Sequence, residues 1–221
     1  MTKESPLPLM PDMVRAYYED RKTQTRRVVK PQSRQTPITN GSAQGEYTAW
    51  PHDDSCLEWN DVIADPAYYA AAGYCPYGAP GDRLWIREAL VRAGAHVAYA
   101  YDYAVVLRDG APVVWPWKRN TLSSRYMPRW ACRSRAELIA VRVEQVQDIS
   151  EADAQAEGAE RELRGPRTYP GRYAARTRET YRDAFGRLWD SINAKRGYDW
   201  ANNPWVWVLT FRRLGCTSVL E

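Results

Sequence analysis

The stretch RKTQTRRVVKP, residues 21–31, decides how the fold of this chain is predicted. Its first seven positions hold four cations and two threonines, and Pro31 ends the β-branched part that follows. Threonine and valine favour extended backbone and proline interrupts a strand ladder, so residues 23–31 predict a β-strand. Three interpretations of its charges stay open: a solvated basic strand, a phosphate clamp, or a catalytic strand.

Lys22 and Thr25 are the candidate reactive residues of this stretch. Lys22 stands at the end of a helical pattern, and Thr25 follows three positions later. A lysine whose pKa is lowered by burial or by nearby cations can act as a base, and a threonine hydroxyl beside it can act as a nucleophile. Arg26 and Arg27 are the candidate substrate clamps, because a guanidinium offers a planar fork of donors.

Composition predicts one domain, residues 1–221, with a hydrophobic core. The chain has 221 residues, of which 44% are hydrophobic, including ten Trp and fifteen Tyr. That is enough apolar surface to bury a core. The chain has no run of eighteen apolar residues, and MTKESPLPLMPD lacks the apolar stretch of a secretory signal. We therefore expect a cytoplasmic protein with no membrane partner.

The cysteines and histidines do not predict a metal site. The four cysteines are widely spaced with no C-x-x-C pair, and there are only two histidines. Zinc sites in proteins use closely spaced Cys and His ligands. We expect free thiols, no metal and no cofactor.

Arginine dominates the basic residues. The net charge is only +4, but five of the 31 basic residues are lysine and the rest are arginine. Arginine forks bind phosphates and stack on aromatic rings, which is typical of nucleic-acid recognition. A GC-rich genome produces the same bias, so composition alone does not indicate nucleic-acid binding. The positions of the arginines distinguish the two explanations.

Periodicity predicts a mixed order of strands and helices without internal repeats. Asp12 is expected to cap a first helix that ends near Asp20, and Ser150 with Asp153 to cap a helix that Gly158 closes. Long insertions are expected at 32–80 and 159–180. The expected strands are 81–88, 95–107 with a hairpin turn at 109–110, 138–149 and 203–214, and a longer helix is expected at 177–195. Together these elements predict an α+β fold, a small mixed barrel with short helices at its corners.

Two further stretches carry candidate substrate-binding residues. In GDRLWIRE, residues 81–88, Arg87 and Glu88 fall on opposite faces of a strand. Glu88 is either buried beside one of the arginines of residues 21–27 or exposed at an edge. In SSRYMPRWA, residues 123–131, guanidinium forks and aromatic faces suit a stacked nucleobase beside a phosphate. The alternative is that Met127, Pro128 and Trp130 seal the core. The candidates in this second stretch are Arg125, Tyr126, Arg129 and Trp130.

Glu157 is the candidate acid. It lies in the last turn of the helix expected in SEADAQAEG, where the helix dipole disfavours an ionised carboxylate. Such a carboxyl group suits a general acid. A solvated helix end is the alternative.

Five blocks together give the chain a family resemblance. It resembles the ASCH family of the PUA-like superfamily, and more closely the ASCH-type proteins of phages and prophages. The resemblance implies a PUA-like β-barrel with flanking short helices and a longer C-terminal helix, in the host cytoplasm if the chain is phage-encoded. The blocks are MVRAYYEDRKTQTRRVV (13–29), GDRLWIRE (81–88), RYMPRWA (125–131), VRVEQVQDISEADAQAEG (141–158) and LWDSINAKRGYDWANNPWVWVLTFRR (188–213).

The resemblance also implies a function. One small bacterial member of the superfamily removes the acetyl group from N4-acetylcytidine, with a Lys and a Thr in a K-T-x-T-x-R block and a Glu in the helix after the central strand. On this chain the roles fall on Lys22 as proton acceptor, Thr25 as nucleophile and Glu157 as proton donor. Other members resemble ribonucleases or non-catalytic readers, so the expected partner is RNA, a nucleoside or a modified DNA base. A structural role in a phage stays open as well.

Overall fold

Two long strands form the centre of the fold. β11 (Arg135–Gln145) pairs antiparallel with β14 (Trp205–Leu214), with a register shift between Leu138 and Ala140. Residues 206–209 of β14 are buried one after another, so both faces of this strand are covered, and its prediction as a central strand is confirmed. The computed structural model describes residues 2–30, 34–37, 46–49, 75–164 and 177–215.

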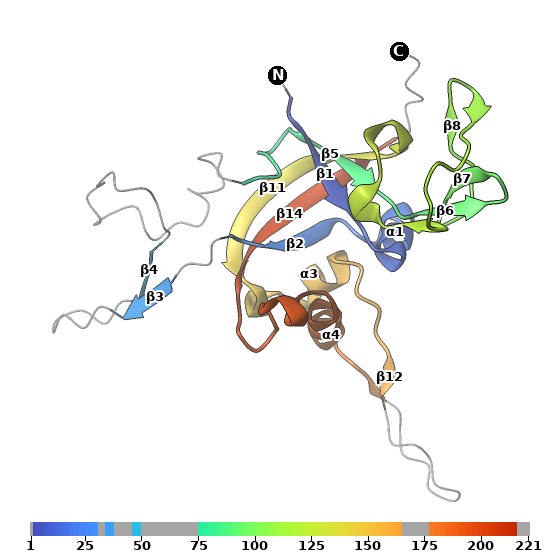
Figure 1. Cartoon of the computed structure of the whole chain (residues 1–221). Helices are drawn as coiled ribbons and strands as arrows, with labels where there is room; N and C mark the ends of the chain where they lie inside the picture. Colours follow the sequence, from blue (N-terminus) through green and yellow to red (C-terminus); the bar gives the residue numbers. More distant parts are fainter. Residues whose placement is uncertain (1, 31–33, 38–45, 50–74, 165–176, 216–221) are drawn as a thin grey trace, which may run out of the picture.

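The main sheet has five strands in the order β1-β5-β11-β14-β2 (Figure 1). β1 runs parallel to β5, and the other neighbours are antiparallel. β1 and β2 stand at its two outer edges, so within the described residues the sheet is open and no closed barrel forms. The expected α+β class is confirmed. The other three strands of this sheet are β1 (Glu4–Pro8), β5 (Arg83–Arg87) and β2 (Gln24–Val28).

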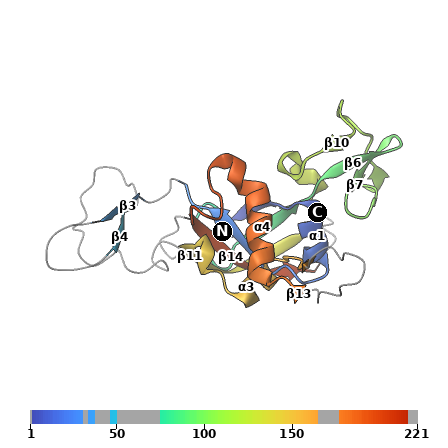
Figure 2. The same ribbon diagram turned by 90° about the horizontal axis from the view of Figure 1, so that it is seen from below.

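Helices cover both faces of this sheet. On one face lie α3 (Glu151–Ala156) and α4 (Tyr181–Asn193) (Figures 1 and 2). Phe185 and Trp189 of α4 pack in one buried cluster with Val206 and Val208 of β14. On the other face α1 (Pro11–Tyr18) packs against a larger cluster that includes Leu209 and Phe211. The alternation of side chains along β14 thus separates two cores.

The first helix begins differently from the prediction. Met10 is its N-cap residue and makes no side-chain capping bond, while Pro11 occupies the first helical position, where a missing N–H costs nothing. Asp12 lies inside the first turn, so its prediction as the cap is wrong. The helix ends at Tyr18, and the chain turns at Asp20, whose φ is +55°.

The two later helices begin at hydroxyl caps. Ser150 Oγ accepts from the N–H of Asp153 at 3.0 Å, and Gly158, with φ +81°, ends this helix as predicted. Thr180 Oγ1 caps α4 in the same way. α4 starts later than predicted because β13 (Thr177–Arg178) pairs with β12 (Leu163–Arg164).

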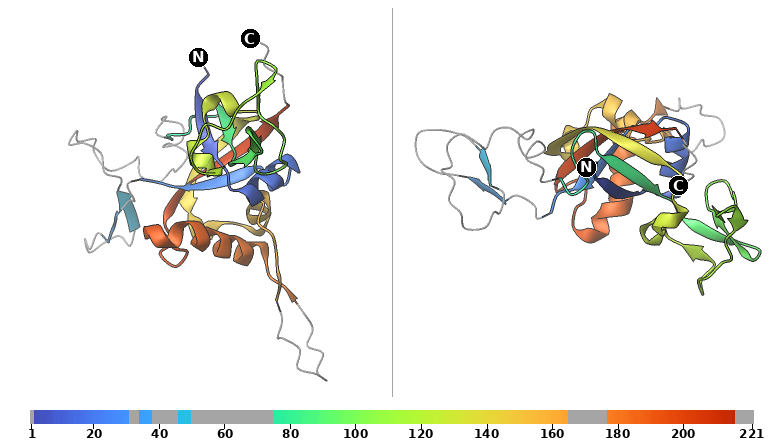
Figure 3. Two further views of the ribbon diagram at one scale, coloured as in Figure 1. Left: turned by 45° about the vertical axis from the view of Figure 1, so that its right-hand side comes forward. Right: turned by 90° about the horizontal axis from the view of Figure 1, so that it is seen from above.

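A smaller sheet stands to one side of the main one (Figure 3). The predicted strand 95–107 is wrong in its length, because it stops at Tyr99 and the chain turns through Tyr103, whose φ is +56°. The predicted hairpin turn at Asp109 and Gly110 is confirmed by positive φ at both residues. The strands of the smaller sheet, in the order β10-β6-β7, are β10 (Thr121–Leu122), β6 (Leu90–Ala93) and β7 (His96–Tyr99), and β8 (Leu107–Arg108) with β9 (Ala111–Pro112) forms a separate two-stranded sheet.

Short 3-10 helices complete the described chain. The predicted strand 138–149 is observed as β11, which begins earlier, at Arg135. It also ends earlier, at Gln145, because residues 146–148 form a 3-10 helix. Of the expected insertions, residues 32–33, 38–45, 50–74 and 165–176 lie outside the described residues. The remaining elements are β3 (Arg34–Pro37), β4 (Glu46–Ala49), η1 (Ser124–Tyr126), η2 (Arg129–Ala131), η3 (Val146–Asp148) and η4 (Ala194–Arg196). None of the described helices is both long and apolar enough to cross a membrane.

Candidate functional site

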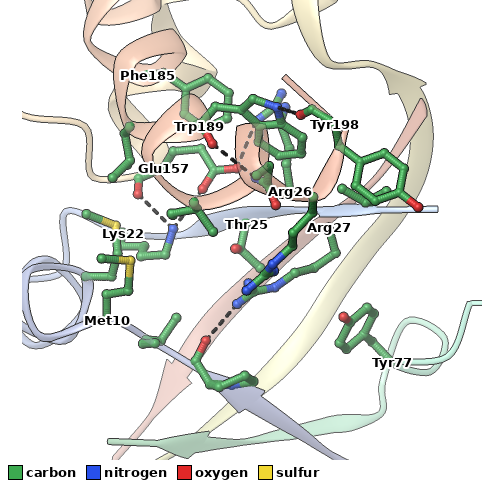
Figure 4. Close-up of a pocket in the computed structure, with 18 of the residues that line it drawn as sticks. Met10, Lys22, Thr25, Arg26, Arg27, Tyr77, Glu157, Phe185, Trp189 and Tyr198 are labelled. Atoms are coloured by element: carbon green, nitrogen blue, oxygen red, sulfur yellow. Dashed lines mark hydrogen bonds and ion pairs between the residues drawn. The ribbon is translucent and has the colours of Figure 1, made fainter. Parts of the chain in front are cut away.

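A cavity of about 290 Å³ opens beside the edge strand β2 (Figure 4). It lies where β2 faces β1, the opposite edge of the sheet, so it occupies the gap that further strand pairing would fill in a barrel. All three candidate catalytic residues line it. The cavity is lined by Pro8, Leu9, Met10, Met13, Lys22, Thr25, Arg26, Arg27, Val28, Lys30, Tyr77, Arg125, Glu157, Phe185, Leu188, Trp189, Ile192, Asn193, Arg196 and Tyr198.

Lys22 is buried, and its ammonium group has three acceptors. Nζ donates to the carbonyl oxygen of Gln24 at 2.8 Å, to that of Glu157 at 2.7 Å and to Glu157 Oε2 at 2.8 Å. Burial lowers the pKa of Lys22, and the Glu157 carboxylate opposes that shift. Lys22 and Glu157 therefore form one buried, coupled pair.

Glu157 joins this pair from the end of α3. It is the C-cap residue of the helix, and its backbone N–H donates to the carbonyl oxygen of Asp153 at 2.8 Å. Its side chain is 5% exposed, and Oε1 accepts from Arg26 Nη1 at 3.3 Å. Two cations thus flank the carboxylate, which is not the solvated helix end that local sequence allowed.

Arg26 is placed among carboxylates. Its side chain is fully buried and contacts Glu144 at 2.6 Å, Asp153 at 3.3 Å and Glu157 at 3.3 Å. Its guanidinium also lies 5.8 Å from the Phe185 ring centre. This arginine therefore holds Glu157 in position, although the sequence predicted a substrate clamp.

Thr25 and Arg27 share the other face of β2. Thr25 is buried and lines the cavity, and among the residues drawn in Figure 4 none is joined to its hydroxyl by a hydrogen bond. Arg27 Nη2 donates to the carbonyl oxygen of Pro8 at 2.8 Å, whereas its Nε is buried and has no partner among the described residues. Both side chains keep hydrogen-bonding capacity for a ligand.

Of the residues predicted in GDRLWIRE, neither lines the cavity. Glu88 is buried, and both its oxygens accept from Arg133, Oε1 from Nε at 2.9 Å and Oε2 from Nη2 at 2.6 Å. The expected burial of Glu88 beside an arginine is confirmed, but this arginine is Arg133 and not one of residues 21–27, and the alternative of an exposed edge position is wrong. Arg87 Nη2 donates to the carbonyl oxygen of Met127, and its guanidinium lies over the Trp85 ring.

The stretch SSRYMPRWA divides between the cavity and the surface. Arg125, on η1, lines the cavity. Tyr126 is 66% exposed, and Trp130 stacks on Trp117 outside the cavity. Arg129 pairs with Glu4. Met127 is buried, so this residue does seal a core as the alternative interpretation held.

Several lining residues were not predicted from sequence. Lys30 follows β2, and its Nζ lies 5.6 Å from the ring centre of Tyr198. Tyr198 and Arg196 flank Gly197, whose φ of +80° turns the chain after α4. Tyr77 falls in the expected insertion. The signal available in the sequence was the mixture of cations and aromatics in AKRGYDW, residues 194–200.

The lining suits an anionic, flat ligand. Six lining residues are cationic and one, Glu157, is anionic. Tyr77, Phe185, Trp189 and Tyr198 supply aromatic faces. Planar rings stack on such faces, and guanidinium groups bind phosphates. Within the described residues, no group of three or more Cys, His, Asp or Glu side chains is arranged to hold a metal ion.

Comparison with protein-family models, curated proteins and solved structures finds no match to this chain. The function is therefore argued from the geometry of the cavity.

Proposed function

We propose that the chain is an ASCH-type hydrolase with a PUA-like fold, an amidohydrolase that removes an acyl group from the exocyclic amine of a cytosine-like base. One observation carries the proposal: the buried Lys22–Glu157 pair, with 2.8 Å between Nζ and Oε2, shares a cavity with the Thr25 hydroxyl, which has no hydrogen-bond partner among the described residues. Nucleophile, base and acid are the three groups that amide hydrolysis requires.

The first half of the reaction begins with a proton shift inside the pair. Lys22 passes a proton to Glu157, which leaves an amine and a carboxylic acid without changing the net charge. Thr25 Oγ1 then attacks the acyl carbon while its proton moves to the Lys22 amine. Glu157 protonates the departing exocyclic amine as the C–N bond breaks, so the products are an acyl-threonine and the free base. Burial supports the first step because it lowers the pKa of Lys22.

Water completes the cycle. A water molecule attacks the acyl-threonine, and its proton moves to the Glu157 carboxylate as Lys22 returns a proton to Thr25 Oγ1. The carboxylic acid product leaves, and the transfer of one proton from Glu157 to Lys22 restores the starting pair. Lys22, Glu157 and Thr25 each end the cycle with the number of protons that they held at the start, because water replaces the proton that leaves with the amine.

The backbone supplies an oxyanion donor in this proposal. The N–H of Val29 donates to the carbonyl oxygen of Trp205, and the carbonyl oxygen of Thr23 accepts from the N–H of Phe211, so both groups point toward β14. Because this pattern alternates along an antiparallel edge strand, the N–H of Arg26 is directed away from β14, toward the gap between the sheet edges. A fixed N–H beside the nucleophile stabilises the negative charge that develops on the acyl oxygen.

A second candidate function rests on a different observation. All three hydrogens of the Lys22 ammonium already have acceptors, as in a purely structural ion pair. A protein of this kind is a non-catalytic reader, which binds RNA or a modified DNA base in the same cavity.

Turnover of N4-acetylcytidine by the purified protein tests the two functions. Thr25→Val keeps the shape of the side chain but removes the hydroxyl, so we expect at least a roughly hundredfold loss of turnover. Thr25→Ser is expected to retain activity. Thr23→Val is the matched control, because Thr23 is exposed and does not line the cavity.

Cytidine binding, measured in parallel, separates the outcomes. A hydrolase shows turnover that falls in Thr25→Val while cytidine affinity stays within about threefold of the wild type. A reader shows no turnover and the same cytidine affinity in both proteins. Equal turnover in the wild type and Thr25→Val proteins contradicts the proposed mechanism.

A further inference from the structure

The cations of the cavity fall into two groups. Lys22 and Arg26 are buried and form ion pairs with carboxylates. Lys30, Arg125 and Arg196 are exposed at the mouth, and in the described part of the chain none of the three pairs with a carboxylate. The inner cations are therefore neutralised by the protein, and the outer ones keep their charge for a ligand.

Arg27 connects the two groups. One end of its guanidinium is fixed by the carbonyl oxygen of Pro8. Its Nε is buried without a partner among the described residues, although a buried donor without an acceptor is costly. A ligand oxygen in the cavity supplies the missing acceptor.

The cations at the mouth come from separate elements. Lys30 lies just beyond the end of β2, Arg196 ends η4, and Arg125 lies on η1. Tyr198 lies beside Lys30 and offers an aromatic face. Cations that converge from several elements around one opening bind a compact anion with several oxygens, and phosphate is such an anion.

We propose that the mouth of the cavity is a phosphate subsite, so that the substrate is a nucleotide and not a free nucleoside. Lys30, Arg125 and Arg196 contact the phosphate, and Arg27 Nε donates to an oxygen of the same nucleotide. The placement of the base deeper in the cavity rests on the proposed function, whereas the phosphate contacts do not require turnover.

Binding titrations that follow tryptophan fluorescence test this subsite. Cytidine is compared with cytidine 5′-monophosphate at low and at moderate salt, and adenosine with its 5′-monophosphate. The phosphate is expected to tighten binding about tenfold for both bases, and added salt is expected to reduce this gain. The phosphate can belong to a nucleic-acid strand or to a mononucleotide, and a short oligocytidylate distinguishes these two cases. Tighter binding than the monophosphate indicates a strand, and equal binding indicates a mononucleotide.

Variants then locate the contact. Lys30→Gln/Arg196→Gln is expected to remove most of the tenfold gain and to leave nucleoside affinity unchanged. Lys195→Gln is the matched control, because Lys195 is an exposed cation of the same 3-10 helix that does not line the cavity. Equal affinity for nucleoside and nucleotide, or an unchanged gain in the double variant, overturns the subsite. Either result leaves the Thr25 turnover test unaffected, so the two proposals fail separately.

Discussion

Arg27 Nη2, on β2, donates to the carbonyl oxygen of Pro8, on β1, over 2.8 Å. The two strands are the outer edges of the main sheet, so a side chain spans the gap that strand pairing would close in a barrel. The exposed edge of a sheet is usually protected by a covering element. Here the gap is kept open as the cavity, and a ligand that enters it lies beside the unpaired edge of β2.

The bridge across this gap predicts the effect of Arg27→Lys. Lysine keeps the charge but loses the fork that donates to Pro8 and the Nε to which we assign a contact with the nucleotide. We expect the free energy of unfolding to fall by about 1.5 kcal/mol, because a partly buried charged hydrogen bond is lost, and nucleotide affinity to fall as well. Urea unfolding and nucleotide titration measure the two effects.

Arg212→Lys is the control for this bridge. Arg212 is an exposed arginine of β14 whose partner is Glu137. We expect its substitution to change the free energy of unfolding by less than about 1 kcal/mol. If Arg27→Lys costs no more than Arg212→Lys, the contact with Pro8 does not hold the two edges together.

The Lys22–Glu157 pair predicts strong coupling. Lys22→Met leaves the buried Glu157 carboxylate with Arg26 as its one cation among the described residues, and Glu157→Gln leaves the buried Lys22 ammonium without a carboxylate, so each should cost about 3–5 kcal/mol of unfolding free energy. Their double variant should cost clearly less than the sum of the two, because neither charge is then left alone.

A double-mutant cycle by urea unfolding measures this coupling. The exposed pair of Asp20 and Arg213, 2.7 Å apart, provides the reference cycle, and its coupling should stay below about 1 kcal/mol. Additive losses at Lys22 and Glu157 would show that each residue acts through other contacts.

Gly158 and Gly197 have nearly the same backbone conformation, so their alanine variants distinguish the cost of backbone strain from the cost of a steric clash. Gly158 has φ +81°, and a Cβ on it would lie 2.8 Å from that of Ala16 and 3.4 Å from that of Lys22. Gly197 has φ +80° and nothing within 4 Å of such a Cβ. Gly197→Ala should therefore cost only about 1 kcal/mol of conformational strain.

Gly158→Ala adds a steric conflict beside Glu157, so it should cost more than Gly197→Ala and should also reduce turnover. Thermal unfolding and the deacetylation assay measure these two effects. Equal losses in the two variants would mean that the backbone shifts to admit the methyl group.

Local sequence patterns predicted those elements whose cause is local. Ser150 caps α3 and Gly158 ends it because both act on the nearest turn. β14 was predicted because apolar residues at consecutive positions require two covered faces. The open edges of the sheet were not predicted, because they depend on which distant strands pair, and no local pattern determines that.

Only part of the site was predicted, because its other contacts also depend on which distant segments of the chain come together. Lys22, Thr25 and Glu157 were identified by a motif and do line one cavity. The partners of Arg26 come from β11 and α3, more than a hundred residues away, so its burial among carboxylates could not be inferred from RKTQTRR. Glu88 pairs with Arg133, 45 residues further along the chain, and no local spacing encodes this contact either.

Glu88 predicts a change in stability without a change in binding. Its carboxylate accepts from Arg133 and from the hydroxyl of Tyr18, and it does not line the cavity. Glu88→Gln should therefore lower the unfolding free energy by about 3 kcal/mol and leave nucleotide affinity unchanged at temperatures where the variant is folded. Weaker nucleotide binding by the folded variant would show that Glu88 does contribute to substrate binding.

Asp82 predicts how stability responds to acid. Its carboxylate accepts from the backbone N–H of Ala79 at 2.9 Å and of Lys3 at 2.8 Å, and these bonds lower the pKa of Asp82 below its ordinary value of 3.8. Between the folded and unfolded values the unfolded chain binds more protons, so stability rises with pH in this window. The contribution is present above about pH 4 and is lost as the pH falls through the folded value.

Asp82→Asn removes this titration. The unfolding midpoint in urea, followed from about pH 5 to about pH 2.5, should fall more steeply in the wild type than in the variant. The two curves should approach each other as the pH falls through the folded pKa of Asp82, because the carboxyl then becomes protonated in both states of the wild type. Parallel curves over the whole range would show that the bonds from Ala79 and Lys3 do not favour the ionised form of Asp82.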